Sequence, residues 1–301
     1  MRQGIAAVIA MVFCTIPFLL IYFDNRSTLK VIYGALLKSS QGVVPEAWVR
    51  RFYEKSAPAR ITYLSQGLTN TGTLYNILAP EVFCPYAVRI GSLDDGGKIV
   101  CNPFRMPWNC SIYSVGIASE VTFEEAIQEF NNYTCRIFGY EKENISSSTF
   151  SRYTRINGRL QQLEISSTTD PENNRYALGD LVERNNDKSV EFLKMDMEGG
   201  EHHFLIPFLE RYKVCQVGFG LRRIVILAFY TQQIFVEIHD TAINQTSLLS
   251  RIAKLDYTLF SHEINAHTST VCEFSFIHID CMQAYGAYML KRYLNSVTVP
   301  T

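Results

Sequence analysis

The sequence lacks any excess of charge of one sign. Its 301 residues include 28 Lys and Arg against 29 Asp and Glu, for a formal net charge of −1. The pairs Arg50-Arg51 and Arg222-Arg223 are isolated from other basic residues. A nucleic-acid-binding face normally needs a basic patch or stripe. No stretch of the sequence could build one, so we expect no nucleic-acid partner.

Cysteine spacing typical of a metal site is also missing. None of the eight Cys falls in a CxxC or Cys/His pattern with zinc spacing, and we expect no metal ligands from the sequence. Disulfides in an oxidising compartment explain the cysteines better, with buried free thiols as the alternative. We expect at least one bridge within the set Cys84, Cys101 and Cys110, and a further pair between Cys272 and Cys281.

Long hydrophobic runs are absent except at the N-terminus, where residues 4–23 carry no charged side chain. At about 1.5 Å per residue, a helix of that length spans a hydrocarbon core of about 30 Å. We therefore predict a short cytosolic tail (1–3), a transmembrane signal-anchor (4–23) and a polar stem (24–80). A cleaved signal peptide is the alternative, but no small-x-small cleavage pattern follows Phe23.

Sequons for N-glycosylation follow the hydrophobic run, at Asn25, Asn109, Asn132, Asn144 and Asn244. Basic residues flank the run on both sides, so the positive-inside rule does not fix its orientation. The sequons and the cysteines together favour a single-pass membrane protein with a lumenal or extracellular domain, in the Golgi or endoplasmic reticulum.

Strand-like and helix-like segments alternate from residue 81 to 296. The expected strands are 111–117, 135–140, 190–195, 233–238, 257–260 and 272–279, and the expected helices are 122–130, 176–183, a segment ending at 211, and 248–254. Thr122 and Glu125 are spaced as a capping box. Alternation of this kind predicts an α/β fold with a mostly parallel sheet. The last two strands lack an intervening helix, which predicts an antiparallel pair at one edge.

The ends of these strands carry the candidate site residues. Ligands of open α/β sheets bind outside the carboxyl ends of the strands, at the switch in strand order. The residues found there are Gly116 and Glu120, Glu141, Asp196 and Glu198, and Glu237 and His239. A single acid at a strand end is as often a helix cap as a ligand contact, so the prediction depends on their combination.

One string at these strand ends is specific. Residues 192–201, Phe-Leu-Lys-Met-Asp-Met-Glu-Gly-Gly-Glu, resemble the "LKxDxEGxE" stretch of the FkbM-type S-adenosylmethionine-dependent methyltransferase family. Segments 95–98, 113–117 and 237–239 resemble its membrane-anchored, methyltransferase-like animal branch. The resemblance covers about residues 82–280. It implies a Rossmann-like methyltransferase fold with a seven-stranded sheet over residues 81–296, and methyl transfer to an unidentified O- or N-acceptor.

The resemblance also implies roles for individual residues. Gly116 and the turn to Glu120 would approach the methionine part of the cofactor, and Glu141 would bind the ribose hydroxyls. Asp196 and Glu198 would border the sulfonium and the acceptor. His239 would act as a general base, although a purely structural histidine is the alternative. The family often has Phe-Asp-Pro where this chain has Tyr140-Glu141-Lys142, so the acid is kept with one more methylene.

Other functions share the plan of anchor, stem and α/β domain. A lumenal metal-dependent glycosyltransferase would use Asp196-Met197-Glu198 as a DxD-like metal site. A non-catalytic domain could keep the methyltransferase fold and lose turnover. Gly199, Glu201 and the acids at the strand ends favour the methyltransferase.

Residues 217–232 interrupt an otherwise continuous approach to the strand at 233–238. A Val codon begins with GT and a Gln codon can end with AG, the two ends of an intron. We therefore predict that this segment is a translated intron rather than an evolved loop, with an additional apolar strand at 224–230 as the alternative.

Overall fold

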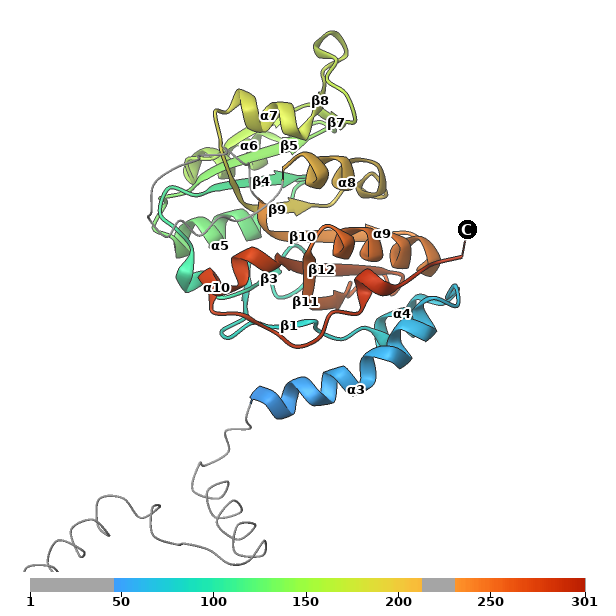
Figure 1. Ribbon diagram of the computed structural model, residues 1–301. Coiled ribbons are helices and arrows are strands. Elements are labelled where there is room, and N and C mark those ends of the chain that lie inside the picture. Colours follow the sequence, from blue (N-terminus) through green and yellow to red (C-terminus); the bar gives the residue numbers. More distant parts are fainter. Residues whose placement is uncertain (1–45, 213–230, 301) are drawn as a thin grey trace, which may run out of the picture. The chain divides into compact units, whose positions relative to one another are not determined.

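A seven-stranded sheet forms the centre of the computed structural model, which describes residues 46–212 and 231–300 (Figure 1). Its strand order is β11-β12-β10-β9-β4-β5-β6. The strands are β4 (Ser111–Val115), β5 (Arg136–Glu141), β6 (Arg159–Gln162), β9 (Val190–Met195), β10 (Thr231–His239), β11 (Tyr257–Ile264) and β12 (Val271–His278).

Strands β6, β5, β4, β9 and β10 pair in parallel, and β12 pairs antiparallel with both β10 and β11. The mostly parallel sheet with an antiparallel edge is therefore confirmed. Strand order reverses between β4 and β9, because β5 and β6 follow on one side and β10 on the other. The carboxyl ends of β4 and β9 thus form the switch point at which a ligand is expected.

Helices cover both faces of the sheet. Helices α7 (Leu178–Arg184), α8 (Glu201–Arg211) and α9 (Ala242–Lys254) share one core, whereas α5 (Thr122–Phe130) and α6 (Ser147–Arg155) share the other (Figure 1). Side chains alternate between the two cores along each strand. On β9, Leu193 and Met195 face α7, α8 and α9, while Phe192 faces the opposite core.

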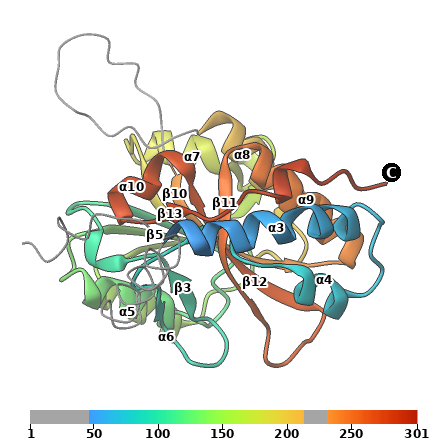
Figure 2. The same cartoon turned by 60° about the horizontal axis from the view of Figure 1, so that its bottom comes forward.

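Two helices lie in the range that the sequence assigned to a stem: α3 (Glu46–Leu64) and α4 (Thr71–Ile77). Leu64 and Leu74 are fully buried in the core that contains α9. Helix α4 packs against α9 (Figure 2), and the Tyr75 hydroxyl donates a hydrogen bond to Gln245 at 3.1 Å. Core packing therefore begins well before residue 81.

The expected anchor at 4–23 and the sequon at Asn25 lie outside the described residues. Across residues 46–212 and 231–300, no helix has both the length and the apolar character to cross a membrane.

Shorter elements surround the main sheet. They are strand pairs β1 (Val82–Phe83) with β13 (Tyr288–Met289), β2 (Val88–Ile90) with β3 (Lys98–Val100) and β7 (Glu164–Ser166) with β8 (Arg175–Ala177), together with η1 (Pro103–Arg105), η2 (Pro171–Asn173), η3 (Ile279–Cys281), α10 (Met282–Tyr285) and η4 (Leu294–Ser296).

The start of α5 differs from the expected capping box. Thr122 is the first helical residue and not the cap, and its amide donates to the Glu120 carboxylate at 2.7 Å. Glu125 binds Arg152 instead of returning to the helix start. A guanidinium offers a carboxylate a bidentate, charge-assisted partner, and this tertiary contact outweighs the local one.

Strand β10 begins earlier than expected, at Thr231. Thr231 pairs with Val190 in β9, and the Gln232 side chain donates to Glu191 at 2.7 Å. The last two residues of the predicted intron segment are therefore part of the sheet. Its other residues, 217–230, lie outside the described part of the chain.

Disulfides join Cys84 to Cys101 and Cys110 to Cys135. The expectation of a bridge within the first set is confirmed. The second bridge ties the residue before β4 to the residue before β5, at the sheet edge opposite the candidate site. The expected Cys272–Cys281 pair is wrong: Cys272 is a buried thiol within β12, and burial raises its pKa.

Non-reducing peptide mapping should therefore recover the pairs Cys84–Cys101 and Cys110–Cys135, with Cys272 alkylated only after unfolding. The chain-entropy model gives each loop about 3 kcal/mol of stabilisation. The Cys110→Ser/Cys135→Ser double variant should therefore melt several degrees lower. Recovery of all four thiols in alkylated form from the native protein would contradict the assignment.

Candidate active site

A cleft of about 800 Å³ opens over the carboxyl ends of β4, β5, β9 and β10. All seven residues that the sequence places at the strand ends line it: Gly116, Glu120, Glu141, Asp196, Glu198, Glu237 and His239. The volume lies within the range of about 300–1,000 Å³ typical of ligand pockets. The fold thus brings together residues that are up to 123 positions apart in the sequence.

Gly116 lies where β4 and β9 come closest. Its φ is +74°, and a Cβ at this position would lie 1.6 Å from the carbonyl oxygen of Asp196. The Gly116 amide donates to Tyr140 O at 3.0 Å, and the Asp196 amide donates to Val115 O at 3.0 Å. Both the backbone conformation and the lack of space therefore require glycine here.

Glu141 holds the loop that follows Gly116. Its side chain is buried, and Oε2 accepts hydrogen bonds from the amides of Ile117 at 2.8 Å and Ala118 at 2.6 Å. Oε1 accepts from the Glu143 amide at 2.8 Å. This carboxylate therefore holds the loop that follows β4. Its contact with the ribose hydroxyls of a cofactor stays a prediction.

Glu120 and Glu198 lie at the edges of the cleft. The Glu120 carboxylate caps α5, as described above, and fills the space beside Gly96. Glu198 is exposed and has a φ of +48° in the turn after β9. The structure gives Glu120 a structural partner, so its role toward the cofactor also stays a prediction.

Glu201 is a positioning residue. From the sequence it was expected only as the last residue of the string at 192–201, without a role of its own. It is fully buried, its Oε2 accepts from the Gly199 amide at 3.0 Å, and its Oε1 accepts from the His239 amide at 3.0 Å. One carboxylate therefore joins the turn after β9 to the end of β10. The signal for it was the final Glu of the string 192–201.

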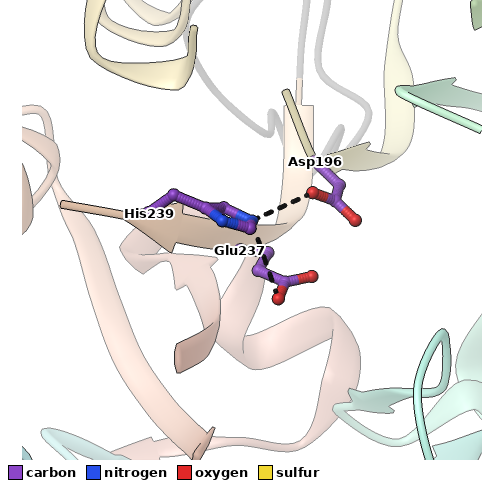
Figure 3. A group of neighbouring side chains, drawn as sticks. All are labelled: Asp196, Glu237 and His239. Carbon is purple, nitrogen blue, oxygen red and sulfur yellow. Dashed lines mark ion pairs between the residues drawn. The ribbon is translucent and has the colours of Figure 1, made fainter. Parts of the chain in front are cut away.

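Asp196, Glu237 and His239 converge on the floor of the cleft. His239 Nε2 lies 3.4 Å from Asp196 Oδ1 and 3.7 Å from Glu237 Oε1, and Figure 3 shows the imidazole directed toward both carboxylates. Glu237 is 3% exposed, and its Oε1 accepts a hydrogen bond from Asn265 at 3.0 Å. Their donor atoms lie within 4.8 Å of one another, close enough to share a metal ion.

This proximity shifts the pKa of each group. Burial, followed by the charges of Glu273 and Asp196, raises the pKa of Glu237 to about 9. Burial acts against ionisation of Asp196 too, but its contact with His239 and the charges of Lys98 and Lys194 hold its pKa below the ordinary value. Asp196 in turn raises the pKa of His239, against the effect of burial.

Two buried ion pairs lie next to this group. Lys194 of β9 contacts Glu124 of α5 at 3.2 Å, and Lys98 of β3 contacts Glu273 of β12. The sequence analysis did not identify Lys98, Glu124 or Glu273 as part of the site, because their partners lie 70 to 175 residues away. Each lysine has a carboxylate partner outside the group of Asp196, Glu237 and His239.

A family profile described as a methyltransferase domain matches residues 49–278, most of the chain. The chain belongs to this methyltransferase family. S-adenosylmethionine is the methyl donor of such an enzyme. The family assignment overturns the glycosyltransferase alternative, and Glu198 is missing from the groups of described residues able to share a metal ion.

Solved structures similar to this methyltransferase are distant. They include the Methanococcus jannaschii fibrillarin pre-rRNA processing protein (11% identity, 64% of this chain and 83% of that chain, TM-score 0.37) and the fibrillarin/Nop5p complex (12%, 67% and 99%, 0.37). A methyltransferase from Pyrococcus furiosus has 11% identity over 73% of this chain and 96% of its own, with a TM-score of 0.31. We draw no argument from likenesses this distant. No curated protein matches the sequence.

The cleft of the methyltransferase fits its cofactor. At Gly116 a bound molecule can approach the backbone directly, because no side chain intervenes. Among the described residues that line the cleft, Asp95, Glu120, Glu141, Glu143, Glu164, Asp196, Glu198 and Glu237 outnumber Lys142 and Lys194. An acidic cleft of this kind attracts a cationic sulfonium.

Gly116→Ala should disrupt the site more than Gly199→Ala does. Both residues have positive φ, so each substitution carries a conformational strain of about 1–3 kcal/mol. At Gly199 the nearest atom to a new Cβ is 3.9 Å away, whereas at Gly116 it is 1.6 Å away. We expect Gly116→Ala to lower the melting temperature further and to abolish S-adenosylmethionine binding. Equal losses of stability in the two variants would show that the Asp196 contact is unimportant.

Proposed function

We propose that this methyltransferase transfers a methyl group from S-adenosylmethionine to an O- or N-acceptor in the secretory pathway, as a member of the FkbM-type group. The observation that carries this proposal is the cleft at the switch point, where the Glu141-bound loop from Gly116 to Ala118 faces Asp196. The string at residues 192–201 supports the FkbM-type assignment, since its Asp196, Gly199 and Glu201 all take part in this geometry.

The cofactor supplies an already activated methyl group, so the protein's main task is orientation. Holding two reactants in line can contribute about 7–11 kcal/mol. The residue 117–118 loop that Glu141 binds forms the β4–β5 end of the cleft, and Glu198 and His239 form the β9–β10 end, with Gly116 and Asp196 adjacent to each other between them. We assign the first end to the adenosine and methionine parts and the second to the acceptor.

His239 is placed to receive the acceptor's proton. A general base contributes about 10²–10⁴-fold when it is neutral at the working pH. Because Asp196 raises the pKa of His239, the neutral imidazole becomes available only at a higher pH than for a free histidine. Activity through this base would therefore rise with pH above about 6.5.

Features of the surface support a lumenal or extracellular location. The disulfides fit an oxidising compartment. Asn109, Asn132, Asn144 and Asn244 are all exposed, as a glycan acceptor must be. Asn244 lies in α9 and its side chain binds Asp240, which makes Asn132 and Asn144 the better acceptors.

Glu141→Ala should weaken S-adenosylmethionine binding more than tenfold by isothermal titration calorimetry. Each hydrogen bond to a charged group is worth about 1.5–3 kcal/mol, and this variant frees the amides of Ile117 and Ala118. Glu129→Ala is the matched control, because Glu129 is an exposed acid outside the lining of the cleft, and it should change affinity less than twofold. A folded Glu141→Ala protein with unchanged affinity would refute the assignment. Wild-type binding of UDP-sugar with Mn²⁺ but not of S-adenosylmethionine would refute the proposed function.

Glycosylation tests the location. Endoglycosidase digestion of the full-length protein from animal cells should lower its apparent mass. Asn132→Gln or Asn144→Gln should make this decrease in apparent mass smaller by the mass of one glycan. Asn244→Gln should leave the decrease unchanged. A protein without glycan, digested by protease from the cytosolic side, would reverse the orientation.

A further inference from the structure

The ends of β9 and β10 present three metal-ligating side chains to the floor of the cleft. Residues 237 and 239 of β10 point to the same side because side chains alternate along a strand. Val236 pairs with Met195 of β9, so Asp196 follows directly beside them. The sheet register therefore places two carboxylates and one imidazole within 4.8 Å of one another.

The imidazole of this group has a ring nitrogen with only long contacts, to Asp196 and Glu237. His239 Nε2 is buried, and it forms no hydrogen bond of good geometry with any part of the chain that the structure describes. Its distances of 3.4 Å to Asp196 and 3.7 Å to Glu237 are those of groups arranged around a shared point rather than bonded to each other. Buried polar atoms normally have partners, so a ligand is expected here.

Charge gives an independent argument for a cation. Lys194 is paired with Glu124 and Lys98 with Glu273, so each nearby ammonium has another carboxylate as its closest partner. Asp196 and the deeply buried Glu237 thus lie beside each other with His239 as the basic side chain that contacts both. Buried carboxylates are normally paired with a cation or coordinate a metal.

We propose that Asp196, Glu237 and His239 bind a divalent cation, with Mn²⁺ as the best match. Carboxylates favour Mg²⁺, Ca²⁺ and Mn²⁺ whereas imidazole favours transition metals, and Mn²⁺ satisfies both. Three protein ligands leave open positions toward the cleft, as in catalytic metal sites. Resting on the proposed methyl transfer, this site specifies the acceptor: a hydroxyl group whose oxygen would bind the cation and release its proton to water in the cleft, with His239 serving as a ligand in place of its role as general base.

A second group, Asp95, Glu237 and Glu273, is also close enough to share an ion. It is the weaker site, because Asp95 is exposed and binds its neighbouring amide at Gly96, while Glu273 is already paired with Lys98. Glu237 belongs to both groups. Variants of the other residues therefore distinguish them.

Binding of Mn²⁺ alone, followed by the loss of the free-ion electron paramagnetic resonance signal, tests the proposal without any methyl transfer. Wild-type protein should bind one Mn²⁺, and Asp196→Asn, Glu237→Gln and His239→Ala should each weaken binding at least tenfold. Asp95→Asn and the exposed-acid control Glu143→Gln should change it less than twofold. Thermal melting of each variant in chelator verifies the fold.

Failure of this site and failure of the proposed function give different results. Wild-type protein in chelator should still bind S-adenosylmethionine, because the loop and Glu141 that we assign to the cofactor lie at the other end of the cleft. If wild-type protein binds S-adenosylmethionine but no Mn²⁺, or if the three variants bind Mn²⁺ as wild type does, the cation site is refuted while the methyltransferase assignment stands. Loss of Mn²⁺ in Asp95→Asn alone would move the site to the second group and overturn this one.

Discussion

The site depends on one constraint: backbone amides that leave the parallel sheet at its carboxyl edge must find acceptors away from water. Buried carboxylates meet this need. Glu141 accepts from three amides in the loops after β4 and β5, and Glu201 accepts from the turn after β9 and from the end of β10. Each carboxylate thereby fixes two strand ends relative to one another. The cleft keeps its shape because its walls are bonded through these side chains rather than through the sheet itself.

The same edge carries acids of two kinds, and their surroundings separate them. Glu141 and Glu201 accept hydrogen bonds from backbone amides. Among the described residues, Glu237 accepts a hydrogen bond from the Asn265 side chain and faces Asp196 and Glu273, and burial, followed by repulsion, raises its pKa to about 9. Carboxylates with backbone donors serve the architecture. Carboxylates that face each other remain available to a ligand. The protein alone stabilises the charge of Glu237 poorly, and the pKa of this carboxyl is raised for that reason.

Local patterns predicted much of this fold, and long-range contacts account for what they did not predict. Strand β9 and helix α5 have the bounds that the sequence predicts, since hydrophobic alternation and period are local properties. The strand-end rule placed Asp196 and His239 in one cleft for the same reason. In contrast, three features depend on partners that are distant in sequence. They are the burial of Leu64 and Leu74, the separate placement of Cys272 and Cys281, and the hydrogen bonds that Glu141 accepts from backbone amides. No local pattern carries that information.

The charge of the cleft determines where catalysis must arise. An acidic cleft binds a cationic sulfonium well, but that positive charge is lost as the methyl group leaves, so the attraction favours the bound donor over the transition state. The acidic lining therefore contributes affinity rather than rate, and it weakens when the neutral thioether product forms, which favours release. Rate must then come from alignment and from the acceptor end of the cleft, where Asp196, Glu237 and His239 converge. The side chains whose charges are least satisfied in the protein alone are thus those that we propose for the chemical step.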